Sequence, residues 1–162
     1  MSGPAPRSLS GDDLSDLLAR HAFGTLATTG ADGLPHLTTM VYAWDPATRT
    51  ARFSSTDGRL KVRHLRADPR AALHVGTSDH WAFAVVQGRA EVSGPTVTPG
   101  DAVGRELLAM LPPEARPEDP AEWYARQVAE RRVVVRLAAT RMYGTALDLP
   151  GAEHLGAGAP QR

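Results

Sequence analysis

The sequence predicts a small, mainly antiparallel β-barrel with helices packed on it. Two strand-like segments, residues 23–29 and 36–44, flank residues 30–33, whose Asp-Gly pair is typical of a tight hairpin. Residues 81–92 and 133–145 are also strand-like and are long enough to bend around a barrel. The chain has no internal repeat, no coiled-coil heptad run and no alternation of strands with helices, which leaves the antiparallel barrel as the expected architecture.

A short amphipathic helix is expected to begin after Ser10. Asp13 stands three residues further on, as in a capping box, and an apolar face then continues through Leu14, Leu17, Leu18 and His21. This helix leads into the first strand of the hairpin.

The second strand of the hairpin has two usable faces, because successive side chains of a strand point in opposite directions. One face carries Leu37, Thr39, Val41 and Ala43, and the other carries His36, Thr38, Met40, Tyr42 and Trp44. Both faces therefore have side chains to bury or to bind.

A strand–loop–helix unit follows the hairpin. Residues 45–48 indicate a turn, residues 50–54 a third strand, and the segment after residues 55–58 a basic helix. Asp68-Pro69 ends this helix, because Pro69 disfavours helical geometry at the residue before it. A further strand is expected at residues 70–75.

The pattern becomes helical between the last two strands, so we expect a helical insert at about residues 95–132. Thr98-Pro99 is expected to open one helix that runs to Met110, and Asp119-Pro120 another that runs to Arg131. The proline-rich residues 111–117 between them indicate a loop.

Composition limits the class of protein. A chain of 162 residues fits one domain, and the lack of cysteine excludes disulfides, thiolate nucleophiles and iron–sulfur clusters. The 18 acidic and 18 basic side chains balance, so nothing drives the chain as a whole toward nucleic acid or an anionic membrane. With no long apolar segment, we expect a soluble, cytoplasmic protein whose residues 1–9 and 149–162 are flexible and whose folded domain spans residues 10–148.

The strand–loop–helix unit is the strongest candidate site. The chain has one lysine against seventeen arginines, and Lys61 lies in its most basic segment, close to Arg59. A lysine kept in an arginine-rich chain favours a role for a compact ammonium group, such as binding phosphate. Ser54, Ser55 and Thr56 add hydroxyls just before the helix start, where N–H groups are unpaired. These groups predict a phosphate-binding cradle, although a solvated surface helix would show the same pattern.

Other catalytic signatures are missing from the sequence. It contains no H-E-x-x-H, G-x-S-x-G, Walker or Rossmann motif, and its six histidines lack zinc-site spacing, so we expect no metal site. His74 and His80 are expected to be interior or rim residues, and Trp81 is a candidate to stack on a planar ligand. An enzyme of this composition would take its chemistry from a cofactor.

Several segments together resemble a known family. They are Phe23-Gly24-Thr25-Leu26-Ala27-Thr28-Thr29, Asp32-Gly33-Leu34-Pro35-His36, Phe53-Ser54-Ser55, residues 61–70 with the pattern K-x-x-x-L-R-x-D-P-R, and Val86-Gln87-Gly88-Arg89-Ala90-Glu91. In this order they resemble the flavin and deazaflavin oxidoreductases of the split β-barrel fold, the superfamily of pyridoxamine 5′-phosphate oxidase. The resemblance covers about residues 10–148 and is greatest to the actinobacterial, biliverdin-reductase-like branch that uses coenzyme F-420 and carries a tryptophan near position 81.

The resemblance implies a homodimer with the cofactor at the interface, strand residues against its ring system and the lysine-bearing helix start at its phosphate. The implied cofactor-binding residues are His36, Leu37, Thr38, Thr39, Met40, Ser54, Ser55, Arg59, Lys61, His64, Thr77, Ser78, His80 and Trp81. Such proteins commonly have asparagine at the position of His64, and a histidine would bring pH sensitivity close to the phosphate. No catalytic residue is singled out. Arginine, histidine or solvent could supply a proton, and the sequence does not rank Arg63, Arg89 and Arg141.

The first functional hypothesis is an F-420-dependent reductase that transfers hydride to a conjugated planar acceptor, such as a tetrapyrrole- or quinone-like molecule. An FMN-dependent oxidase or reductase of the same fold is the alternative within enzymes. A non-enzymatic flavin- or haem-binding protein, with His64, His74 or His80 as haem ligand, is the alternative from another class.

Overall fold

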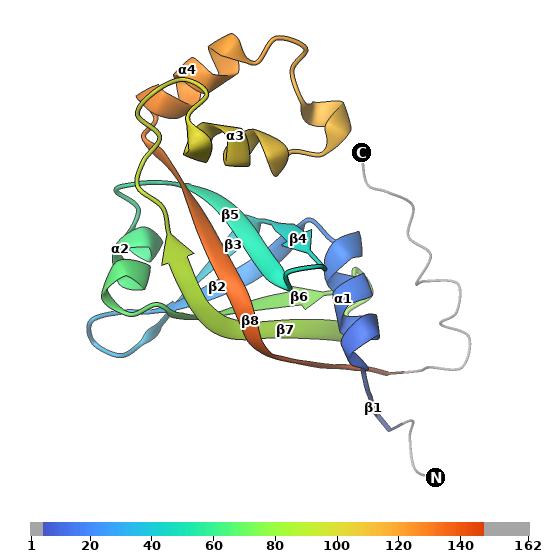
Figure 1. Ribbon diagram of the computed structural model, residues 1–162. Coiled ribbons are helices and arrows are strands. Elements are labelled where there is room, and N and C mark those ends of the chain that lie inside the picture. The colour runs from blue at the N-terminus through green and yellow to red at the C-terminus, as the bar shows by residue number, and fades with distance from the viewer. Residues whose placement is uncertain (1–4, 148–162) are drawn as a thin grey trace.

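A single antiparallel sheet curls around the core in the computed structural model, which describes residues 5–147 (Figure 1). Its strand order is β3-β2-β6-β7-β8-β5-β4, with β1 paired to β8. The strands are β1 (Arg7–Ser8), β2 (Phe23–Thr29), β3 (Pro35–Val41), β4 (Ala43–Asp45), β5 (Thr50–Thr56), β6 (Arg70–Gly76), β7 (Ala82–Val92) and β8 (Arg132–Ala146). The predicted mainly antiparallel, split-barrel class with peripheral helices is confirmed. Arg7 and Ser8, within the segment expected to be flexible, pair with Ala146 and Thr145, whereas the expected C-terminal tail lies outside the described residues.

The β2–β3 hairpin forms as its Asp-Gly pair predicts. Gly33 has a φ of 81°, a conformation that side chains disfavour, and its N–H donates to the Gly30 carbonyl. The Asp32 carboxylate accepts the Leu34 N–H at 3.0 Å, which closes the turn. The turn thus sets the register in which Thr28 pairs with His36.

The segment expected as one strand at residues 36–44 is divided into β3 and β4. Tyr42 lies between them, with its N–H bonded to the Ala22 carbonyl and its hydroxyl donating to the Leu18 carbonyl at 2.7 Å. The expected alternation of faces is confirmed, since Met40 and Tyr42 point inward while Leu37 is 62% exposed.

Helix α1 (Gly11–Arg20) has the predicted capping box, in which Ser10 and Asp13 bond reciprocally at 3.1 Å. Its buried face of Leu14, Leu17 and Leu18 packs on the barrel. His21 was expected to extend that face, but it follows the last helical residue and its Nδ1 lies 2.8 Å from the Leu17 carbonyl.

Helix α2 (Leu60–Ala67) lies at the other end of the barrel, beside the β2–β3 hairpin (Figure 1). Val62 and Leu65 are its buried residues. The helix ends at Asp68, before Pro69, as predicted, with the Asp68 N–H bonded to the His64 carbonyl.

The segment between β7 and β8 contains α3 (Ala102–Ala109), a short 3₁₀ helix (Pro113–Ala115) and α4 (Ala121–Ala129). The expected start of the first helix at Thr98 is wrong. Asp101 is the cap, because its carboxylate accepts the N–H groups of Val97, Thr98 and Gly104. The predicted second helix is present, but it ends at Ala129 instead of Arg131.

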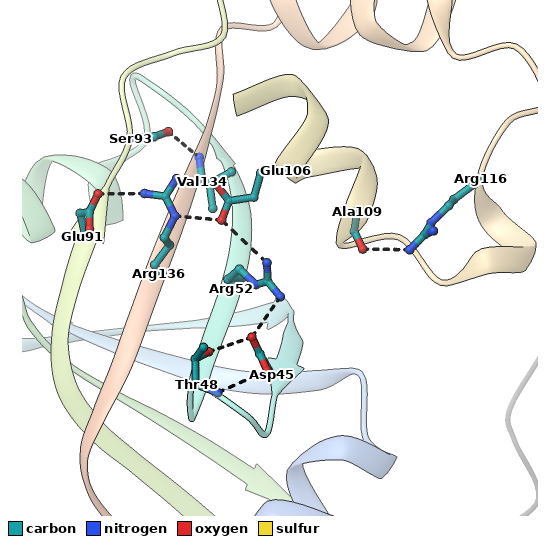
Figure 2. Close-up of polar contacts among 10 residues, drawn as sticks. All are labelled: Asp45, Thr48, Arg52, Glu91, Ser93, Glu106, Ala109, Arg116, Val134 and Arg136. Carbon is teal, nitrogen blue, oxygen red and sulfur yellow. Dashed lines mark hydrogen bonds and ion pairs between the residues drawn. The ribbon is translucent and has the colours of Figure 1, made fainter. Parts of the chain in front are cut away.

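An ion-pair network attaches α3 to the sheet (Figure 2). The Arg136 guanidinium of β8 donates to both carboxylate oxygens of Glu106, at 2.8 and 2.5 Å, and also to Glu91. Arg52 lies 4.0 Å from Glu106 and 3.8 Å from Asp45. The network holds the insert over the outer face of β5 and β8.

The barrel interior is apolar, with Leu26, Phe53, Leu73, Val86 and Leu137 fully buried. Such a core supplies most of the stability of a domain of this size. Among residues 5–147, no helix has the length and apolar character needed to cross a membrane.

Candidate functional site

The start of α2 is the most electropositive part of the candidate site. Its N-cap, Arg59, makes no side-chain capping bond, and no acidic residue occupies the first turn. The first N–H groups of a helix lack partners within the helix and form its partially positive end. With Arg59 and Lys61 added, this end of α2 favours an anion.

Lys61 is half-buried beside these groups. Burial and, to a smaller extent, the nearby Arg59 lower the pKa of its ammonium group. Within the described part of the chain, no carboxylate forms an ion pair with it. A bound anion would offset both unfavourable effects, so Lys61 is suited to hold a phosphate.

The hydroxyls that precede α2 do not form one cluster. Ser55 faces the barrel interior and is 4% exposed, whereas Ser54 and Thr56 lie on the outer face of β5. The Ser54 hydroxyl accepts a long 3.4 Å bond from Arg132, at the root of the insert. Ser55 is therefore the serine on the same side of β5 as the interior face of β3.

Unpartnered polar atoms line the interior face of β3. The hydroxyl of Thr38 and Nδ1 of His36 are buried and have no hydrogen-bond partner among residues 5–147. Strands β3 and β5 approach each other without a ladder of hydrogen bonds, which leaves a seam between them in the barrel. Because a buried hydroxyl without a partner is costly, Thr38 fits a ligand that brings oxygen acceptors to the seam.

An open hollow of about 470 Å³ adjoins this seam, between the hairpin and α2. His64 contributes to its wall, and its Nδ1 atom forms a 3.1 Å hydrogen bond with the Thr28 hydroxyl. The His36 and His64 rings meet edge to face, with centroids 5.3 Å apart. The lining residues are Gly30, Ala31, Asp32, Leu34, Pro35, His36, Leu60 and His64.

The sequence-predicted residues of the β6–β7 turn lie at the opposite end of the barrel. Strand β6 has seven residues and so separates the turn from α2 by about 20 Å. The Asp79 carboxylate accepts the Thr77 hydroxyl at 2.6 Å and the Trp81 N–H at 3.0 Å. His80 has a φ of 65° and Trp81 is 44% exposed. Thr77, Ser78, His80 and Trp81 therefore do not meet Lys61 within one chain.

The outer face of β3, β2, β6, β7 and β8 carries exposed apolar side chains. Phe23, Leu37 and Val41 are more than half exposed, and Thr39 is exposed beside them. The ring of His74 stacks on Phe83 with centroids 5.4 Å apart, and Arg141 lies over the ring of the exposed Tyr143. Exposed apolar side chains that gather on one face are typical of a protein interface.

The fold and the segments around this site match a known family. A family model described as pyridoxamine 5′-phosphate oxidase matches residues 11–146. The chain belongs to this family. A curated relative, the F420H(2)-dependent biliverdin reductase of Mycobacterium tuberculosis (strain CDC 1551 / Oshkosh), is 29% identical over 138 residues, which are 85% of this chain and 89% of the relative.

Solved structures agree with membership of the pyridoxamine 5′-phosphate oxidase family. A structure described as an F420 reductase is 28% identical with a TM-score of 0.61, and the match covers 83% of this chain and 97% of that one. A conserved hypothetical protein from Mycobacterium tuberculosis has a TM-score of 0.69 at 24% identity and covers 94% of this chain and 99% of its own. The latter likeness concerns the fold alone.

One feature of this pyridoxamine 5′-phosphate oxidase family member escapes sequence reasoning. Asp57 lies in the loop between β5 and α2 and bonds to Arg66 and Arg131. Arg131 is 74 residues away in the chain, so no local pattern connects the two. The only signal in the sequence is an acidic residue within an otherwise basic segment.

Proposed function

We propose that this protein is an F-420-dependent reductase that transfers hydride to a conjugated planar acceptor of tetrapyrrole- or quinone-like shape. The observation that carries the proposal is the uncapped, basic start of α2, a helix whose His64 ring meets the ring of His36 on β3. Support for the deazaflavin comes from the biliverdin reductase relative, whose name includes F420H(2).

In this proposal each polar group of the site has a binding role. Lys61 and the first N–H groups of α2 neutralise the phosphate of the coenzyme, and Thr38 donates a hydrogen bond to it. Ser55, buried on β5, narrows the seam and excludes water. The bound coenzyme supplies the hydride, so the protein contributes orientation and an environment with little water.

A second copy of the chain would complete the site. The exposed apolar face over β3, β2 and β6–β8 is suited to bury itself in a symmetric homodimer. Such a dimer would allow the β6–β7 turn of one protomer, which carries Trp81, to approach the start of α2 in its partner. Within one chain, the length of β6 keeps these two segments apart. The exposed ring of Trp81, whose backbone N–H is bonded to Asp79, would then lie against the planar part of a ligand.

An FMN-dependent oxidase or reductase is the alternative, because a cradle built for one phosphate does not distinguish the ring attached to it. The family description, pyridoxamine 5′-phosphate oxidase, is consistent with such chemistry.

Titration of the purified protein with F-420 and FMN, followed by absorbance and fluorescence, tests the proposal. We expect F-420 to bind more tightly and its reduced form to be reoxidised in the presence of a tetrapyrrole or quinone acceptor. Tight binding of FMN with no binding of F-420 would overturn the first proposal and support the alternative. A Soret band on haem addition that disappears on His64→Ala, with no binding of either coenzyme, would support a carrier protein.

Sedimentation velocity tests the dimer, and Leu37→Glu is expected to produce monomers that bind the coenzyme weakly.

A further inference from the structure

Asp57 joins three separate segments beside the start of α2, where the candidate phosphate site lies. Its Oδ1 accepts a 2.6 Å bond from Arg66 of α2, and its Oδ2 accepts a 2.9 Å bond from Arg131, directly before β8. Its backbone N–H donates to the Arg131 carbonyl at 3.0 Å. One side chain therefore connects the β5–α2 loop, the helix it precedes and the end of the helical insert.

The connected loop is the one that orients the start of α2. The Arg59 N–H donates to the Thr56 carbonyl at 3.1 Å, which closes a turn around Asp57 and Gly58. Lys61 follows within the first turn of the helix, so a shift of the loop moves its ammonium group and the free N–H groups together. Because α2 has no side-chain cap, the bonds of Asp57 to Arg66 and Arg131 are the side-chain contacts that hold the loop before its first turn.

A carboxylate is an unexpected neighbour for an anion site, because its charge repels a phosphate. Two guanidinium groups compensate the charge here, and both lower the pKa of the Asp57 carboxyl. The charge of Asp57 and its bonds to the two arginines therefore have opposite expected effects on anion affinity when the carboxylate is removed. Loss of the negative charge alone would strengthen binding of an anion, whereas loss of the connection would weaken it.

We propose that Asp57 is a positioning residue, which acts through Arg66 and Arg131 to hold the start of α2 in the geometry that binds the cofactor phosphate. The inference rests on the proposed function, because it assigns a task at the same cradle. It also connects the insert to cofactor affinity, because Arg131, which lies between α4 and β8, bonds to Asp57.

The test compares Asp57→Asn with Asp68→Asn at the other end of the same helix. Asp68 also forms a 2.6 Å ion pair, with Arg70, and its side chain is 25% exposed against 21% for Asp57. Dissociation constants for F-420, FMN and inorganic phosphate are measured for wild type and both variants, together with thermal midpoints without ligand. We expect Asp57→Asn to weaken F-420 binding about tenfold, the size of one lost charge-assisted hydrogen bond. Asp68→Asn should leave binding unchanged even if it lowers the midpoint equally.

Two further variants separate positioning from general destabilisation. Asp57→Glu, which keeps the charge, should recover part of the affinity, and Arg131→Gln should add little to the defect of Asp57→Asn in a double-mutant cycle. Unchanged or tighter F-420 binding by Asp57→Asn, in a protein whose wild type binds F-420, overturns this inference and leaves the proposed function intact. A wild type that binds none of the three probes overturns both.

Discussion

Replacement of Lys61 by alanine tests the candidate site most directly. The side chain is half-buried at the start of α2, and no carboxylate in residues 5–147 competes for its ammonium group. The replacement therefore removes one positive charge from the site and breaks no ion pair. The free energy of unfolding should change by less than about 0.5 kcal/mol, as for surface substitutions without a special role.

The expected effect on binding follows from the surroundings of the charge. A unit charge pair 4 Å apart contributes about 4 kcal/mol at the effective dielectric constant of about 20 that applies near a protein surface. Net contributions of hydrogen bonds to charged groups are smaller, at about 1.5–3 kcal/mol, because water competes for both partners. We therefore expect Lys61→Ala to weaken cofactor binding by about 1–3 kcal/mol, or about 5- to 150-fold in Kd.

Fluorescence titration with F-420 at constant ionic strength measures this effect. Arg63→Ala is the matched control, because it removes one positive charge from an exposed position on the same helix. Lys61→Arg should retain part of the affinity, since the charge remains while its geometry changes. Equal losses for Lys61→Ala and Arg63→Ala would refute the cradle, because only the net charge of the helix would then matter.

Three other substitutions give distinct outcomes. Gly144→Ala should lower the free energy of unfolding by about 2–4 kcal/mol in urea titrations, because its Cβ would lie 2.0 Å from the Phe83 carbonyl oxygen. Arg136 lowers the pKa of Glu106, so this carboxylate stabilises the fold fully above about pH 4.5 and less as the pH falls through its lower folded-state value. Thermal melts from pH 7 to pH 3 should accordingly show a weaker dependence for Glu106→Gln than for wild type. Thr38→Val should weaken F-420 binding without loss of stability, since the buried hydroxyl has no partner in the part of the chain that the structure describes.

Each of these variants has a control in the same chain. Gly76→Ala should be mild, because its Cβ would meet nothing closer than 3.7 Å. Glu91→Gln removes the exposed partner of Arg136 and should change the pH dependence less than Glu106→Gln. Thr50→Val removes a threonine hydroxyl at the start of β5, the end of that strand away from α2, and tests whether loss of any threonine hydroxyl changes binding. A stable Gly144→Ala, parallel pH profiles or a Thr38→Val that only lowers stability would contradict the respective reasoning.

Local features of the fold could be predicted because neighbouring residues determine them. The capping box of Ser10 and Asp13, the hairpin at Gly33 and the end of α2 before Pro69 all depend on side chains within a few positions. The start of α3 is equally local but was predicted wrongly, because Thr98 and Asp101 are both preferred N-cap residues. Thr98-Pro99 has the residue types of a helix start, yet the Asp101 carboxylate accepts three N–H groups and displaces it.

The candidate site was predictable only in part. Lys61 and His64 belong to one short segment, so their closeness to the α2 start follows from the sequence. Sheet curvature decides that the rings of His36 and His64 meet. It also leaves the Thr38 hydroxyl without a hydrogen-bond partner among residues 5–147. The grouping of Ser54 with Ser55 fails, because adjacent residues of a strand point to opposite faces.

By itself the sequence determined a mainly antiparallel barrel, a basic helix start with the single lysine and a family resemblance that carries a cofactor hypothesis. These rest on patterns with periods of two to four residues and on motifs read along the chain. Only the tertiary structure decided which side of β5 becomes interior, how far the Trp81 turn lies from Lys61 and that Asp57 meets Arg131. The physical reason is that strand register and sheet curvature bring together residues more than 40 positions apart, and no local preference encodes those contacts.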